Sequence, residues 1–156
     1  SHDTERILTT AKGDLQSVKS ALAFLYLQRG TPCIYYGTEL ALIGGPDPDC
    51  RRVMPWERVS ADNDMLNFMK ELIQLRKEVA GMIQHGKGGL KEVEPDVVAV
   101  EWQHEGHILK AYFNHSKKNV VLEREQADLI SHGSISDDRL IIQPNGFVIY
   151  REELNV

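Results

Sequence analysis

Residues 30–37, which read GTPCIYYG, decide the fold expected for the first half of the chain. Within them, residues 33–36 form a continuous run of β-forming residues that does not alternate with polar ones. Such a run is typical of a strand buried on both faces, as in a parallel sheet covered by helices. This segment therefore predicts an α/β fold.

Amphipathic helices are predicted on both sides of this strand. Apolar residues recur at spacings of three and four over residues 14–29, where Asp14 is a suitable N-cap. The same pattern returns from Asp64, and Gly81 is its expected end. Residues 38–63 contain the turn-rich stretch GGPDPD and predict a long loop. A loop of this length in a compact domain usually carries function.

After residue 89 the apolar period changes to two, which predicts an antiparallel β region. Glu105-Gly106 is expected to form a hairpin turn, and Asn145-Gly146 a turn of the primed type. Strands are expected at residues 98–103, 108–112, 119–122, 140–142 and 147–150. The chain is therefore predicted to divide near residue 83, into one part at residues 1–83 and a second part at residues 84–156.

The composition excludes several classes of protein. The 156 residues carry a net charge of −5, and no basic patch offers the phosphate contacts that nucleic acid or an anionic membrane surface requires. No apolar run approaches the roughly 20 residues of a membrane span. The two cysteines, Cys33 and Cys50, are too few for a disulfide scaffold. No nucleic-acid or membrane partner is expected.

Three short motifs suggest chemistry, and two of them fail on spacing. The histidines of His104-Glu105-Gly106-His107 are three apart in a predicted hairpin, whereas a zinc metalloprotease needs them four apart on a helix. A calcium-binding EF-hand that began at residue 47 would need Gly and Glu where the chain has arginines, although another kind of calcium site stays open. Cys50 precedes two arginines that would lower the pKa of its thiol, so a reactive thiolate is one alternative and an inert thiol the other.

Three longer motifs carry a family resemblance. They are SHDTER at residues 1–6, GTPCIYYG at residues 30–37 and DPDCRRVMPW at residues 47–56. Together they resemble the alpha-amylase family of glycoside hydrolases, in particular its neopullulanase, maltogenic amylase and cyclomaltodextrinase group. This resemblance implies the last βα units of a (β/α)₈ TIM barrel, followed by an antiparallel β-sandwich as the C-terminal domain. It also implies cleavage of α-glucosidic bonds with retention of configuration.

The resemblance assigns roles to four residues. Asp3 matches the family carboxylate that stabilises the transition state, and His2 matches the histidine that hydrogen-bonds a hydroxyl of the sugar being cleaved. Asp47 and Arg51 match loop positions that bind the next glucose on the non-reducing side. A structural salt bridge that shapes the loop is the alternative for this pair.

Five further residues receive weaker interpretations. Tyr35, Tyr36 and Trp56 could stack on sugars, although burial in a strand is favoured for the two tyrosines. Glu39 is expected to stabilise the rim of the barrel, and Arg6 is expected to neutralise buried acids.

The chain is expected to be a fragment of a longer enzyme, because it opens without Met and its first half lacks a sheet to complete it. The nucleophile and general acid would lie on earlier barrel strands, so the isolated chain is expected to be inactive. The implied substrate is an α-glucan or cyclodextrin, with no required cofactor, a cytoplasmic location and a homo-oligomeric state. A non-catalytic carbohydrate-binding or interaction module is the alternative function, and transglycosylation is the alternative reaction.

Overall fold

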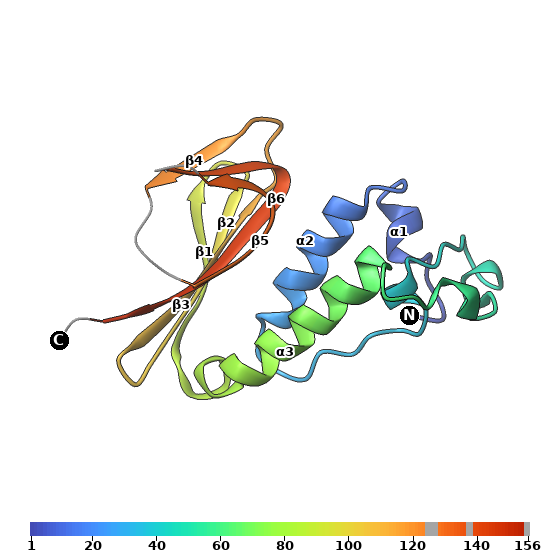
Figure 1. The fold of residues 1–156 in the computed structure, drawn as a ribbon, viewed down its shortest axis with the longest axis horizontal. Helices are drawn as coiled ribbons and strands as arrows, with labels where there is room; N and C mark the ends of the chain where they lie inside the picture. The colour runs from blue at the N-terminus through green and yellow to red at the C-terminus, as the bar shows by residue number, and fades with distance from the viewer. Residues whose placement is uncertain (124–127, 137–138, 155–156) are drawn as a thin grey trace.

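The computed structural model describes residues 1–123, 128–136 and 139–154 of the chain. Figure 1 shows two layers, a helical layer that includes two long helices and an antiparallel sheet that packs against them. The helices are α1 (Ile7–Thr10), α2 (Leu15–Tyr26) and α3 (Asp64–His85), with short 3₁₀ turns η1 (Thr38–Leu40), η2 (Asp49–Arg51) and η3 (Trp56–Arg58). The strands are β1 (Lys87–Glu94), β2 (Val97–His104), β3 (His107–Asn114), β4 (Val120–Glu123), β5 (Asp128–Ser136) and β6 (Arg139–Glu153).

The two long helices form where the apolar periodicity predicts them. The side chain of Asp14 accepts hydrogen bonds from the backbone N–H groups of Gln16 and Ser17, so the expected cap of α2 is confirmed. The prediction that Gly81 ends α3 is wrong, because this helix continues to His85. Glycine inside a helix costs only about 1 kcal/mol relative to alanine, and buried apolar residues on both sides of it hold the last turns against the core.

The strand predicted at residues 33–36 is not found. These residues belong to no β ladder, the side chain of Cys33 is exposed and Tyr36 is 38% exposed. A parallel strand requires a neighbouring strand for its hydrogen bonds. No strand among the described residues pairs with residues 33–36. The βα units of a barrel are therefore not seen within the part of the chain that the structure describes.

Within the described residues, the β region is one six-stranded antiparallel sheet, with the order β1-β2-β3-β6-β4 and with β5 paired to β6. The predicted hairpin turn between β2 and β3 is confirmed, because Glu105 and Gly106 both have positive φ angles, of 47° and 78°. The antiparallel character of this region is confirmed, but its strands form one sheet where two packed sheets of a sandwich were expected.

The turn predicted at Asn145-Gly146 is wrong, because the chain passes through it as the single strand β6. Asn145 has a φ angle of 58°, and the pairing with β5 shifts between His132 and Ser134 at the same level. Strand β5 pairs with β6 on both sides of this irregularity, whereas β4 pairs with its first part and β3 with its second part. The ladder with β5 thus keeps β6 continuous across a local sequence that favours a turn.

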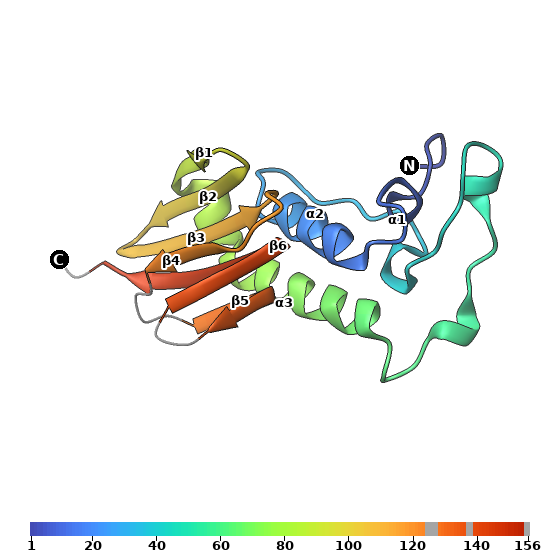
Figure 2. The same ribbon diagram turned by 90° about the horizontal axis from the view of Figure 1, so that it is seen from above.

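The larger of two hydrophobic clusters among the described residues joins the helices to the sheet, and it is continuous across residue 83. Figure 2 shows α2 and α3 lying together beside the sheet. The indole N–H of Trp102 donates to the carbonyl of Leu27 over 2.8 Å, and the rings of Phe24 and Phe113 meet edge to face at 5.5 Å. At the other end of α2, the amide of Asn145 donates to the carboxylate of Asp14 over 3.0 Å.

Candidate functional site

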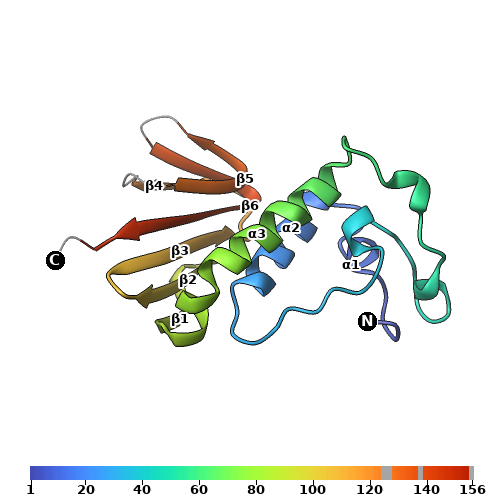
Figure 3. The same ribbon diagram turned by 60° about the horizontal axis from the view of Figure 1, so that its bottom comes forward.

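The candidate site lies at the end of the molecule away from the sheet, where the N-terminal segment meets the loop that follows residue 43. Figure 3 shows both segments at this end. Two hydrogen bonds join them close to α1. The backbone N–H of Arg6 donates to the carbonyl of Gly44, and the N–H of Gly44 donates to the hydroxyl of Thr9, each over 2.9 Å. Segments that are about 40 residues apart in sequence are thereby held together.

The structure brings all four predicted site residues into one cluster. Nε2 of His2 lies 3.2 Å from Oδ1 of Asp3, and Nη2 of Arg51 lies 3.7 Å from that same oxygen. Nε of Arg51 contacts Asp47 at 2.6 Å and also donates to the carbonyl of His2 over 3.2 Å. Arg51 therefore lies between two carboxylates. All four side chains are about half exposed or more, so the cluster is open to solvent.

A second ion pair shapes the loop beneath this cluster. Arg52 donates two hydrogen bonds to the carboxylate of Asp49, at 2.7 and 2.8 Å, and the N–H of Gly45 donates to Asp49 over 2.7 Å. The hydrogen bond from Arg52, followed by that from Gly45, lowers the pKa of Asp49. This pair closes the loop on itself, which leaves Arg51 to contact Asp47 and Asp3.

Cys50 lies beneath the cluster and is fully buried. Its thiol donates to the carbonyl of His2 over 3.1 Å. The interpretation of Cys50 as a reactive thiolate is therefore wrong, because reagents cannot reach the sulfur and the arginines that follow it face Asp47 and Asp49 instead.

Arg6 is 3% exposed and also lies beneath the cluster. Its Nε donates to the carbonyl of Cys50 over 2.6 Å, and its Nη1 donates to the carbonyl of Tyr36. Its guanidinium carbon lies 4.1 Å from the ring centre of Tyr35 and 4.5 Å from that of Tyr36. Arg6 was expected to neutralise buried acids, but no ion pair to it is found within the described residues. Sequence reasoning gave Arg6 acidic partners and missed the backbone carbonyls that it binds, because these lie 30 and 44 residues away in the chain.

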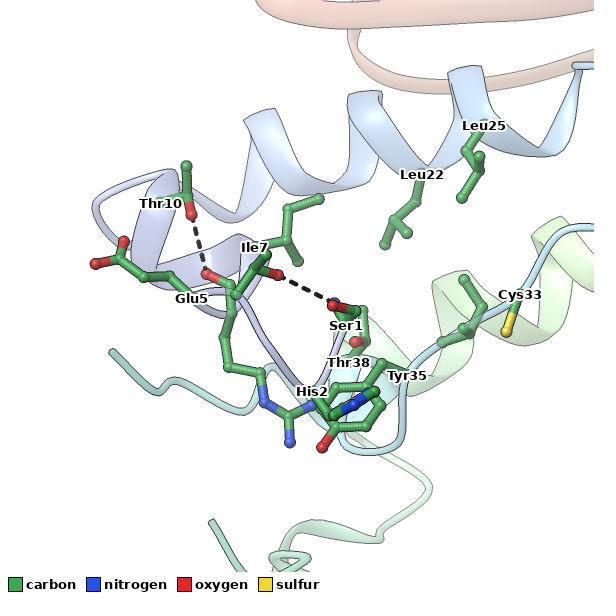
Figure 4. Close-up of a pocket in the computed structure, with 13 residues that line it drawn as sticks. Ser1, His2, Glu5, Ile7, Thr10, Leu22, Leu25, Cys33, Tyr35 and Thr38 are labelled. Atoms are coloured by element: carbon green, nitrogen blue, oxygen red, sulfur yellow. Dashed lines mark hydrogen bonds between the residues drawn. The ribbon is translucent and has the colours of Figure 1, made fainter. Parts of the chain in front are cut away.

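A cavity of about 800 Å³ opens beside the cluster, between α1, α2 and residues 33–38. Figure 4 shows Leu22 and Leu25 lining it from α2, with His2 and Tyr35 at its other end. The walls are mainly apolar. Trp56, which was considered for sugar stacking, is 70% exposed on η3 and is absent from this lining.

The described residues contain no group of three or more histidine, cysteine, aspartate or glutamate side chains placed to hold a metal ion. His104 and His107 face each other as the last pair of the β2–β3 hairpin. Among residues 1–123, 128–136 and 139–154, no helix is long and apolar enough to cross a membrane.

Residues 1–77 match the family described as the alpha amylase catalytic domain, and this part of the chain belongs to that family of glycoside hydrolases. Its relatives identify the group. The chain is 34% identical to the intracellular maltogenic amylase of Bacillus subtilis, over 96% of the chain and 27% of that protein. It is also 34% identical to a cyclomaltodextrinase of Thermoanaerobacter pseudethanolicus, over 97% of the chain and 27% of that protein. A neopullulanase of Thermoactinomyces vulgaris also matches.

A solved structure resembles the whole chain. The maltogenic amylase from S. marinus matches with a TM-score of 0.76 at 25% identity, over 100% of this chain and 22% of that one. The chain thus spans about a quarter of the length of the proteins that it resembles.

Proposed function

We propose that the chain is the C-terminal part of a retaining glycoside hydrolase that cleaves α-glucosidic bonds in α-glucans, maltodextrins or cyclodextrins. One observation carries the proposal. Asp3 and His2 come from the first motif, Asp47 and Arg51 come from a motif more than 40 residues later, and all four meet in one exposed cluster. The relatives named as maltogenic amylase and cyclomaltodextrinase support the substrate class.

In the proposed mechanism, Asp3 faces the ring whose bond is cleaved. Its carboxylate stabilises the positive charge that develops on the sugar in the transition state, and His2 hydrogen-bonds a hydroxyl of the same ring. Such contacts accelerate the reaction only if they strengthen as the transition state forms.

Asp47 and Arg51 would bind the neighbouring glucose. A carboxylate accepts hydrogen bonds from sugar hydroxyls, and a guanidinium group donates to their oxygens. The 2.6 Å ion pair between these two residues is compatible with a purely structural role. The additional approach of Arg51 to Asp3, at 3.7 Å, favours a role in the site because it connects the pair to the residue assigned to the transition state.

The nucleophile and the general acid of the reaction are assigned to polypeptide that precedes these residues, so the 156-residue chain alone should not cleave glucans. No cofactor is required in this proposal, and calcium binding stays open. A cytoplasmic location is supported by the relative named as an intracellular enzyme. A homo-oligomeric state is retained as a prediction. Transglycosylation would use the same residues, and product analysis of an active enzyme separates it from hydrolysis.

The alternative of a carbohydrate-binding module receives less support. Such a module needs exposed aromatic rings on one sheet face. Trp102, Phe113 and Phe147 are buried in the cluster that joins the helices to the sheet. The two remaining candidates, Tyr112 and Tyr150, stack on each other at 6.1 Å and pack against a second apolar cluster, so neither ring is fully free for a sugar. Measurable affinity of residues 84–156 for a glucan would favour this alternative.

The proposal is tested in a chimera in which residues 1–156 replace the matching segment of the T. pseudethanolicus cyclomaltodextrinase. Asp3→Asn should lower kcat about a hundredfold or more while KM changes by less than about threefold, because a contact made mainly in the transition state is lost. The matched control is Asp62→Asn, an exposed carboxylate outside the cluster. A kcat for Asp3→Asn within about a factor of two of the parent would reject the assignment.

A further inference from the structure

The buried guanidinium of Arg6 has no role in the proposed chemistry. Charged side chains are almost never fully buried unless they are paired, yet Arg6 is 3% exposed and no carboxylate within the described residues forms an ion pair with it. Two backbone carbonyls and two tyrosine rings surround it instead, and its Nη2 atom lacks a hydrogen-bond partner. These contacts indicate that Arg6 has a structural role that an apolar side chain of similar size could not fill.

The partners of Arg6 show what it holds. One is the carbonyl of Tyr36, at the turn that follows residues 33–35, and the other is the carbonyl of Cys50, within η2. Its own backbone N–H donates to Gly44, at the start of the same loop. Arg6 therefore joins the N-terminal segment to two other segments through backbone groups, which fixes their positions whatever side chains they carry.

Cys50 connects Arg6 to the site, because one of its groups binds Arg6 and another binds His2. While its carbonyl accepts from Arg6 at 2.6 Å, its thiol donates to the carbonyl of His2 at 3.1 Å. The next residue, Arg51, donates to the same carbonyl at 3.2 Å and approaches Asp3 at 3.7 Å. The separation between Asp3 and Arg51 is thus set by contacts that pass through Cys50.

The loop also has little freedom to relax at this point. A Cβ atom added at Gly44 would lie 2.6 Å from the carbonyl oxygen of Asp49 and 3.2 Å from Cγ of Arg6. The backbone of the loop therefore passes directly against the Arg6 side chain, and a shorter cation in place of Arg6 would leave the Cys50 carbonyl without its donor.

We propose that Arg6 and Cys50 are positioning residues, which hold the loop bearing Asp47 and Arg51 at the distance from Asp3 that the site needs. The geometric part of this inference is independent of any activity, and its catalytic part rests on the function proposed above.

The geometric part is tested in the 156-residue chain through the thiol of Cys50. Cys33→Ser removes the exposed thiol, so a disulfide reagent such as dithionitrobenzoate then reports on Cys50 alone. Arg6→Lys should raise the rate of modification about tenfold or more, because lysine cannot bind both carbonyls and the loop opens.

Arg76→Lys is the matched control, since Arg76 also donates to backbone carbonyls, those of Tyr26, Gln28 and Gly30, but at the opposite end of α2. Its rate should stay close to that of the parent, with melting curves confirming that both variants are folded. Equal rates in the two variants would overturn the inference.

The catalytic part is tested in the chimera by separating kcat from KM. Arg6→Lys should lower kcat about tenfold, whereas Arg76→Lys should stay within about a factor of two. Cys50→Ser keeps a hydroxyl donor for the His2 carbonyl and should retain more activity than Cys50→Ala, which has none. These two variants differ little in size, so they keep the test decisive if Arg6→Lys does not fold.

The outcomes separate the two proposals. If Asp3→Asn has no effect in the chimera, the proposed function fails, whereas the thiol measurements still decide the geometry. If Asp3→Asn lowers kcat but Arg6→Lys resembles Arg76→Lys, and Cys50→Ser resembles Cys50→Ala, the positioning role is overturned while the proposed function stands.

Discussion

Replacement of Trp102 by phenylalanine tests whether the helices and the sheet share one core. Trp102 lies on β2, is 4% exposed, and donates its indole N–H to the carbonyl of Leu27 just after α2. The guanidinium of Arg29 lies 4.9 Å from the indole ring. Phenylalanine keeps an aromatic ring at this position but has no N–H, so Trp102→Phe removes the hydrogen bond that crosses the two layers.

The expected loss can be worked from these contacts. A buried carbonyl without its donor costs about 1–3 kcal/mol. The weaker cation–π contact adds about 0.5 kcal/mol, and the space left by the smaller ring adds about 1 kcal/mol. Trp102→Phe should therefore lower the free energy of unfolding by about 2.5–4.5 kcal/mol, a large fraction of the roughly 5–15 kcal/mol typical of a domain.

Urea unfolding of the 156-residue chain measures this loss, followed by far-UV circular dichroism and by tryptophan fluorescence. The matched control is Trp56→Phe, since Trp56 is 70% exposed and its replacement should change stability by no more than about 0.5 kcal/mol. This control also leaves Trp102 as the sole tryptophan, so its fluorescence reports on the interface. A change of less than about 0.5 kcal/mol in Trp102→Phe would refute the reasoning, as would separate transitions for helices and sheet.

Three further outcomes are expected. Burial, and then the nearby Lys19 ammonium, lower the pKa of His132, so the unfolded chain binds a proton more readily than the folded one. The stability that the neutral ring contributes is complete above about pH 6.5 and is lost as the pH falls below that value. Urea titrations should therefore show that the free energy of unfolding depends less on pH in His132→Gln than in the parent chain. The same pH dependence in both proteins would contradict this prediction. Asn114 is fully buried, and its amide donates to the carbonyls at positions 118, 142 and 143. Asn114→Asp buries an unpaired carboxylate there, so the free energy of unfolding should fall by about 3–5 kcal/mol at neutral pH and recover in part when acid protonates the carboxylate. Equal stability of the variant at both pH values would argue against this. Exposed apolar surface around Leu25 predicts self-association of the chain, to be measured by sedimentation and weakened in Leu25→Glu, and a monomeric parent chain would exclude it.

The candidate site was predictable to the extent that its residues lie in recognisable motifs. The sequence placed Asp3, His2, Asp47 and Arg51 in two motifs, and the structure brings the two together. The residues beneath them were not predictable. The sequence indicated acidic partners for Arg6 and left Cys50 open between an inert and a reactive thiol, whereas both side chains bind backbone carbonyls. Contacts with distant segments leave no local pattern in the sequence.

The sequence alone determined the features whose energetics are local. The capped helix at Asp14 and the hairpin turn at residues 105–106 follow from side-chain and backbone preferences within a few residues. Only the tertiary structure decided the others. Residues 33–36 have strong β preference but no neighbouring strand, and Asn145 favours a turn but lies within a strand because β5 pairs on both sides of it. A strand exists only through hydrogen bonds to another segment, so its fate depends on contacts distant in sequence.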